Sequence, residues 1–392
     1  MRHHTGLLSL WFMAVSAGAC GSDGGSVEQG GDAGANDTDS GFTAVEDPSQ
    51  ASSFADFDRV IEDFLSESGL TGASAIIVHR EEGVLHHQGY GAFDKDRIYA
   101  IASSSKVLSV GILMRLQDQG LLDVDEPIGS YLEELFGAGK PELTVAQLVS
   151  NSSGLTSLLE NPTYGPYICQ YLEAGTLTDC AKAIYTADDA MDRVEPDTRF
   201  SYGGGPWQLS GGVAEVVSGK SWAELVDETY APCGVTTLGY TNPFQQYQTN
   251  YPMLDGDPAN AAVTNNPNIE GGAYVSMSDY AAILLMHLRG GMCDGGQALS
   301  LAAVERMRQD RIAEAYDGST GAAGALEGYG LGWWIDRDQE GFFADGGAYG
   351  ATAWLDLSRD YAGFVALEAT STEGRALFAK LQPVVESVID AR

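Results

Sequence analysis

The sequence predicts an α+β fold, with one antiparallel sheet built from both ends of the chain and flanked by helices, plus a mainly helical lobe. Two observations support it. In this chain of 392 residues, a strand–turn–strand pattern beside a helical segment occurs near each end of the folded body. Between them, from about residue 107 to residue 288, helical spacing of apolar residues dominates. The terminal segments can therefore share one sheet, and the middle forms the second lobe.

The N-terminal elements are a helix and a hairpin. Apolar residues at helical spacing predict the helix, namely Phe57, Val60, Ile61, Phe64 and Leu65. Residues 73–79 and 84–91 are then strand candidates on either side of a short turn. At the other end, residues 352–357 and 361–367 flank a second short turn, and a helix over about 374–391 closes the chain.

The first 53 residues do not belong to the folded body. Residues 1–19 are typical of a signal peptide, because Arg2 precedes an apolar run and small residues. The end of this segment is similar to a bacterial lipoprotein signal, in which Cys20 becomes the lipidated first residue. Residues 20–53 are rich in Gly, Asp and Ser and predict a flexible tether. We expect an exported protein of the bacterial cell envelope, bound to membrane only through lipid at Cys20; plain secretion is the alternative.

The net charge limits the partners that the protein can bind. The cysteine content bears on the compartment in which it works. The net charge of −34 excludes nucleic acid, because phosphate binding needs a basic surface. Four cysteines lie in the folded domain, residues 54–392. An even count in an exported chain predicts two disulfides, and of the three connectivities we favour Cys169 with Cys180 and Cys233 with Cys293. Free buried thiols are the alternative.

The run Ser103-Ser104-Ser105-Lys106 opens a helix and puts a hydroxyl and an amine one turn apart. Residues three apart on a helix share a face, with Cβ atoms about 5–6 Å apart. Lys106 can then take the proton of Ser103, but only as a neutral amine, so burial must lower its pKa. The dense apolar residues over 107–116 predict such burial. The alternative is an ordinary capped helix start with a surface lysine.

Other catalytic designs lack their residues in this chain. No serine stands in a Gly-x-Ser-x-Gly sequence, which excludes an α/β-hydrolase nucleophile. The six histidines have no metal-ligand spacing, and no Gly-rich phosphate loop is followed by lysine. We therefore expect neither a metal nor another cofactor.

Further motifs follow Ser103-x-x-Lys106 in a fixed order over about residues 54–390. Together they resemble the serine β-lactamase and penicillin-binding-protein superfamily, in particular its β-lactamase-related esterase and D-peptidase branch. The resemblance implies a β-lactamase/transpeptidase-like fold and a catalytic domain over residues 54–392. The motifs are Leu116-x-x-x-Gly120-x-Leu122-x-x-Asp125-x-Pro127, Leu148-x-x-Asn151-Ser152-Ser153-Gly154-Leu155, Phe200-Ser201-Tyr202-Gly203-Gly204-Gly205, Gly271-Gly272-Ala273-Tyr274-x-Ser276-x-x-Asp279, Tyr329-Gly330-x-Gly332-Trp333 and Asp345-Gly346-Gly347-Ala348.

The resemblance implies acyl transfer in two steps. Ser103 would attack a carbonyl, Lys106 would take its proton, and Tyr202 would move a proton between nucleophile and leaving group, its pKa lowered by Lys106. The N–H groups of Ser103 and Ala348 would form the oxyanion hole. A structural tyrosine at 202 and an ordinary turn at 345–348 are the alternatives.

Departures from the family pattern bear on the substrate. Asp345 stands where many relatives carry lysine or histidine, and it would repel a substrate carboxylate. Gly204 replaces the asparagine of the second motif and removes its amide. Both changes favour a neutral ester, or a substrate with an amine, over a β-lactam. Tryptophans at 207, 333 and 334 would wall an acyl pocket or pack in the core. The residues expected to contact substrate are Asp345, Gly346, Gly347, Gly204 and Trp333.

Three functions remain open. The favoured one is a serine hydrolase that acts on small esters or amides through an acyl-enzyme. The second is a β-lactamase or D-Ala-D-Ala carboxypeptidase with the same chemistry. The third is a catalytically weak binding or sensor module on the same scaffold, which the changes at Gly204 and Asp345 make credible.

Overall fold

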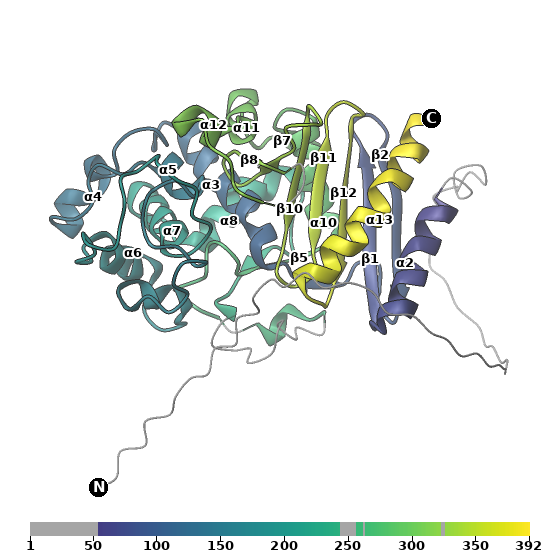
Figure 1. Cartoon of the computed structure of the whole chain (residues 1–392), viewed down its shortest axis with the longest axis horizontal. Coiled ribbons are helices and arrows are strands. Elements are labelled where there is room, and N and C mark those ends of the chain that lie inside the picture. The colour runs from purple at the N-terminus through teal and green to yellow at the C-terminus, as the bar shows by residue number, and fades with distance from the viewer. Residues whose placement is uncertain (1–53, 244–255, 262, 323–325) are drawn as a thin grey trace, which may run out of the picture. The chain divides into compact units, whose positions relative to one another are not determined.

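The computed structural model describes residues 54–243, 256–261, 263–322 and 326–392 (Figure 1). The expected signal peptide, the tether and the lipidation site at Cys20 lie outside these residues. Within the described part of the chain, no helix combines the length and the apolar character that crossing a bilayer requires.

The main sheet has seven strands, and its recorded strand pairings are antiparallel. Strands from the two chain ends meet in it, since Ala73 pairs with Leu367 and His79 with Tyr361. Figure 1 shows the N-terminal strand β1 beside the C-terminal strand β12. The predicted sheet of both termini is confirmed. Its spatial order is β2 (Gly83–Gly91), β1 (Gly72–His79), β12 (Tyr361–Leu367), β11 (Thr352–Asp356), β10 (Phe342–Gly346), β9 (Trp334–Ile335) and β8 (Gly328–Tyr329).

Side-chain alternation along β1 explains how the sheet is covered on both faces. Ile76 and Val78 face the larger hydrophobic cluster, whereas Ala75 and Ile77 face a second cluster on the other side. The helix α10 (Met277–Leu288) packs on the first face. The terminal helices α2 (Ala55–Ser68) and α13 (Ser371–Asp390) pack on each other and on the second face.

The helix α3 (Ser105–Asp118) is buried without interruption from Ser105 to Met114. Its burial follows from the apolar run predicted for it, and it packs against helices of the second lobe. A small sheet that sequence reasoning missed flanks its start, in the order β3 (Ile98–Ala100), β5 (Ala273–Ser276), β4 (Gly239–Tyr240). Other helices of the chain are α4 (Gly129–Phe136), α5 (Val145–Val149), α6 (Leu177–Tyr185), α7 (Gly205–Ser218), α8 (Trp222–Tyr230), α11 (Leu301–Arg308) and α12 (Arg311–Tyr316).

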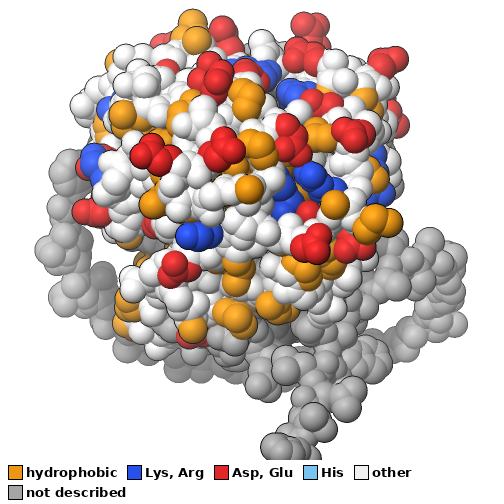
Figure 2. All heavy atoms as spheres, turned by 90° about the vertical axis from the view of Figure 1, so that its left-hand side faces the viewer, with side chains coloured by type: hydrophobic (Ala, Val, Ile, Leu, Met, Phe, Trp, Pro, Cys, Tyr) orange, Lys and Arg blue, Asp and Glu red, His pale blue; other side chains and the backbone are white. Residues whose placement is uncertain are grey.

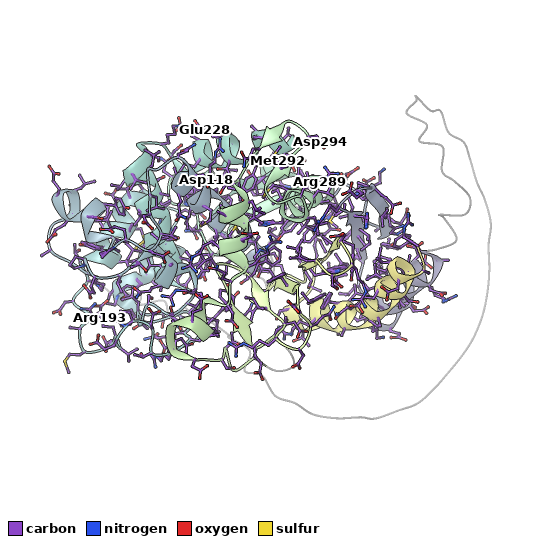
Figure 3. All side chains as sticks on the ribbon, turned by 90° about the horizontal axis from the view of Figure 1, so that it is seen from above. Asp118, Arg193, Glu228, Arg289, Met292 and Asp294 are labelled. Carbon is purple, nitrogen blue, oxygen red and sulfur yellow. A yellow bond between two sulfur atoms is a disulfide. The ribbon has the colours of Figure 1, made fainter. Side chains whose placement is uncertain are left out.

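Two disulfides join the pairs favoured from the sequence. Cys169 and Cys180 bond at an S–S distance of 2.01 Å, and Cys233 and Cys293 at 1.93 Å. Cys293 lies on β6 (Met292–Cys293), which forms a hairpin with β7 (Gly296–Gln297). Figure 3 labels Arg289 and Asp294 at this hairpin, where Arg289 Nη1 lies 3.0 Å from Asp294 Oδ1.

Candidate active site

Ser103 lies in a one-turn 3-10 helix, Ala102–Ser104, between β3 and α3. The Ile101 N–H donates to the Ala273 carbonyl at 3.0 Å and ties the approach to this turn onto β5. Lys106 follows on the first turn of α3, and its Nζ donates to Ser103 Oγ at 3.2 Å. The hydroxyl and the amine therefore meet directly, as their spacing in the sequence predicts.

Lys106 is surrounded by acidic and aromatic groups. Its Nζ donates to the Glu270 backbone carbonyl at 3.0 Å and lies 3.2 Å from Glu270 Oε2, and the two side chains are only 1% and 4% exposed. Nζ also lies 4.6 Å from the ring centre of Tyr202 and 5.2 Å from that of the buried Trp207. Burial lowers the pKa of this amine, but the groups around it, Glu270 among them, raise it by more. The net direction is upward, so the predicted lowering is wrong.

Tyr202 reaches the same place from the turn before α7. Its ring centre lies 4.6 Å from Lys106 Nζ, and the Ser103 side chain lowers the pKa of its phenol. Asn151 holds the turn, because its Oδ1 accepts the Gly203 N–H at 3.0 Å. Burial raises the pKa of Tyr202, and the Lys106 charge offsets only part of this rise. The expected lowering by Lys106 therefore exists but does not prevail, and the resting group is a phenol.

The end of β10 lies against the turn that carries Ser103. A Cβ at Gly347 would sit 2.0 Å from the Ile101 carbonyl oxygen, so the close approach of the two segments requires glycine. Ala348 follows in an exposed turn. The Ser103 N–H belongs to the first turn of a helix, where backbone N–H groups have no partner within the helix. The two segments expected to supply the oxyanion hole are thus neighbours.

Asp345 faces the protein interior, not the solvent. Its side chain is 0% exposed, whereas its neighbour Gly346 is exposed, as alternation along β10 requires. Burial raises its pKa well above the usual range, and the Lys106 charge and the Val107 N–H offset only part of that. This rise favours the protonated acid. The prediction that Asp345 contacts and repels a substrate carboxylate is wrong, because it assumed an exposed side chain.

The two adjacent tryptophans have different environments. Trp333 is 0% exposed and packs in the core, with ring centres 5.5 Å from His287 and 6.4 Å from Phe343. Trp334 is partly exposed, and its ring centre lies 5.3 Å from that of Tyr202. Successive residues of an extended segment point to opposite faces. The prediction of a substrate contact at Trp333 is therefore wrong, and Trp334 is the tryptophan whose ring lies partly exposed beside Tyr202.

Glu270 is the residue of the site that sequence reasoning missed. Its Oε2 accepts the Gly204 N–H at 2.8 Å, so this N–H, at a position expected to contact substrate, is bonded within the protein. A Cβ at Gly203, whose φ is +77°, would lie 2.6 Å from Oε2, and one at Gly204 would lie 2.7 Å from the Leu158 nitrogen. The missing side chain at Gly203 thus makes room for the Glu270 carboxylate, and the one at Gly204 makes room for the Leu158 backbone. The available signal was an acidic residue directly before Gly271 and Gly272.

Comparison with known proteins agrees with this architecture. A family model described as Beta-lactamase matches residues 57–382. Penicillin-binding protein 4 of Amycolatopsis lactamdurans is 28% identical over 290 residues, which are 70% of this chain and 72% of that protein. Esterase EstB of Burkholderia gladioli is 27% identical over 228 residues, 53% of this chain and 56% of the relative.

A solved structure confirms the predicted β-lactamase/transpeptidase-like fold. EstCE1, described as a hydrolase with promiscuous acyltransferase activity, superimposes with a TM-score of 0.68 at 19% identity and covers 87% of this chain and 98% of its own. The family match spans most of the domain that carries Ser103, Lys106 and Tyr202. The chain belongs to the beta-lactamase family and is a serine hydrolase.

Proposed function

We propose that this hydrolase cleaves small neutral esters or amides through an acyl-enzyme on Ser103. The observation that carries the proposal is the convergence of three groups: Lys106 Nζ lies 3.2 Å from Ser103 Oγ and 4.6 Å from the ring centre of Tyr202. A nucleophile, a proton acceptor and a proton donor are the parts that acyl transfer needs.

In the proposed reaction, Ser103, Lys106 and Tyr202 each act once in acylation and once in deacylation. In acylation, Ser103 Oγ bonds to the substrate carbonyl carbon, its proton passes to Lys106, and the N–H groups of Ser103 and Ala348 hold the oxyanion. Tyr202 gives its proton to the departing alkoxide or amine. In deacylation, the phenolate takes a proton from water, the hydroxide attacks the acyl carbonyl, and Lys106 returns its proton to Ser103.

The surroundings of Tyr202 favour a neutral substrate with an apolar group. Phe200, Tyr202 and Trp334 are all partly exposed, and the Trp334 ring centre lies 5.7 Å from Phe200 and 5.3 Å from Tyr202. Aromatic faces of this kind bind apolar surface. Lys106 Nζ already lies 3.2 Å from Glu270 Oε2, so it is not free to bind a substrate carboxylate.

The test uses purified protein and three substrate classes: a chromogenic short-chain ester, a D-amino amide and a chromogenic cephalosporin. The Ser103→Ala variant is expected to lose ester hydrolysis. Ser278→Ala is the matched control, because that exposed serine bonds only Asp96 at the surface and its loss leaves the rate unchanged. Equal hydrolysis by wild type and Ser103→Ala would defeat the proposal.

The alternative function, a β-lactamase or D-Ala-D-Ala carboxypeptidase, draws support from the relative named penicillin-binding protein. The same assay separates it from the proposal. Rapid cephalosporin turnover, or covalent labelling of Ser103 by penicillin with slow release, would favour the alternative. Hydrolysis of the ester without either result favours the esterase. A binding or sensor module would show neither turnover nor a difference between wild type and Ser103→Ala.

We further propose that the enzyme works outside the cytoplasm, anchored through lipid at Cys20. The two disulfides support an oxidising compartment. Figure 2 shows many Asp and Glu side chains among the Lys and Arg side chains of the visible face, which fits the net charge of −34. In cells, Cys20→Ser should move the protein from the membrane fraction to the soluble fraction. An unchanged membrane fraction would contradict the anchor.

A further inference from the structure

Tyr202 lies between two backbone groups that are both bonded to one residue, Asn151. The Ser201 N–H donates to the Asn151 backbone carbonyl at 2.7 Å, and the Gly203 N–H donates to Asn151 Oδ1 at 3.0 Å. Residues 201 and 203 are the direct neighbours of Tyr202 in the chain. Asn151 therefore fixes the backbone on both sides of this tyrosine.

The same side-chain oxygen of Asn151 also holds Trp207, which lies on the first turn of α7. The Trp207 Nε1–H donates to Asn151 Oδ1 at 2.8 Å. The ring centres of Tyr202 and Trp207 lie 4.6 Å and 5.2 Å from Lys106 Nζ. One amide oxygen thus joins the Tyr202 turn to the tryptophan that lies beside Lys106.

The backbone of Asn151 has a conformation that glycine adopts more easily. Its φ is +59°, in the left-handed region, and the residue is only 1% exposed. Asparagine enters this region at a smaller cost than most residues, but glycine enters it without strain. The hydrogen bonds of the amide are therefore what asparagine adds at this position.

Asn151 does not contact the nucleophile itself. In the part of the chain that the structure describes, its Oδ1 bonds to Gly203 and Trp207, and no hydrogen bond joins Asn151 to Ser103 or Lys106. An effect of Asn151 on the reaction must then pass through the residues that it holds. Among these, Tyr202 is the one to which the proposed function assigns a proton transfer.

We propose that Asn151 positions Tyr202 to donate its proton to the leaving group. This inference rests on the proposed function. In acylation, the bond between the carbonyl carbon and the leaving oxygen breaks, the Tyr202 O–H bond breaks, and its proton bonds to that oxygen, so a phenolate remains on Tyr202. Proton transfer needs the donor within hydrogen-bond reach of the oxygen, which the bonds on both sides of Tyr202 secure. Asn151 acts through Tyr202 and is a positioning residue.

The test compares p-nitrophenyl acetate with ethyl acetate in Asn151→Gly, which keeps the backbone conformation and removes the amide. The two esters differ only in the leaving group: nitrophenolate departs without a proton, whereas ethoxide needs one. We expect kcat/KM, which reports acylation, to fall about 100-fold for ethyl acetate, the usual weight of a general acid, and less than about threefold for the nitrophenyl ester. A merely structural role would lower both values equally.

A double variant tests whether Asn151 acts through Tyr202. Tyr202→Phe removes the phenolic proton and should show the same difference between the two esters. Addition of Asn151→Gly to Tyr202→Phe should cost less than about a further threefold with ethyl acetate, because the two changes remove one function. Asp317→Gly is the matched control, since Asp317 also has a left-handed backbone, with φ of +52°, but is exposed at the end of α12. Its rates should equal those of wild type.

Two results would overturn the inference: an equal loss with both esters in Asn151→Gly, or a full additional loss in the double variant. Ser103→Ala separates this failure from that of the proposed function. If Ser103→Ala is inactive while Asn151→Gly treats both esters alike, only the role of Asn151 falls. Melting temperatures confirm that each variant is folded. If Asn151→Gly is not, Asn151→Ser, whose side chain is too short to replace the amide, takes its place with the same expected result.

Discussion

Replacement of Lys106 by methionine should show how much the buried ion pair contributes to the free energy of unfolding, and whether ester hydrolysis needs Lys106. The change removes the cation that faces Glu270, whose side chain is 4% exposed. Loss of one partner of a buried pair leaves an unpaired charge and typically costs about 3–5 kcal/mol. The Gly204 N–H still contacts Glu270, so we expect the lower end, about 3 kcal/mol. Urea unfolding at pH 7 measures the loss, and ester hydrolysis should disappear.

The double variant Lys106→Met with Glu270→Gln tests whether the lost stability comes from the unpaired charge, as in a double-mutant cycle. Because it buries no unpaired charge, it should regain most of the lost free energy of unfolding but none of the activity. The matched control is Lys220→Met, which breaks an exposed pair with Glu228 whose side chains are 42% and 47% exposed and should cost less than about 1 kcal/mol. A loss below about 1 kcal/mol for Lys106→Met, or ester turnover by the double variant, would refute the reasoning.

Three further predictions concern the surroundings of the site. Trp334→Ala should lower kcat/KM about tenfold for esters with long acyl chains and less for acetyl esters, whereas Trp333→Ala should cost about 3–5 kcal/mol of stability by urea unfolding. Asp345→Asn should raise the melting temperature, more at pH 8 than at pH 4. The raised pKa of Asp345 means that the folded state holds a proton that the unfolded state releases above about pH 4, so wild-type stability falls as pH rises; an equal effect at both pH values would contradict this. Burial lowers the pKa of His287 to about 3, so the unfolded state gains a proton first as pH falls below about 6.5. Wild type should lose about 2 kcal/mol between pH 6.5 and pH 5 from this group, and His287→Leu should show a smaller loss in urea unfolding.

The sheet was predictable because its signals are local. Short apolar runs on either side of a turn identify strands within a few residues, and they give β1 and β12 nearly the bounds found in the structure. The strands β8 and β9 have two residues each, too short for any alternation to be read. Their place in the sheet depends on the longer strand β10, which they extend.

The central pair of the site was predictable for the same reason, since Ser103 and Lys106 are one helical turn apart. Glu270 was not, because it contacts Lys106 across a sequence separation of 164 residues. The direction of the Lys106 pKa shift depends on that contact, so it could not be predicted from the sequence. The choice between Trp333 and Trp334 depends on a shift of one residue, which reverses the face of every side chain in a strand.

Mass spectrometry of a trapped acyl-enzyme tests the central claim most directly. The intact protein is quenched in acid during turnover of a slow ester, and peptide mapping locates the added acyl group. We predict one acyl group per chain, on Ser103, absent from Ser103→Ala and reduced in Lys106→Met. An acyl group on another residue, or the same adduct in Ser103→Ala, would contradict the account.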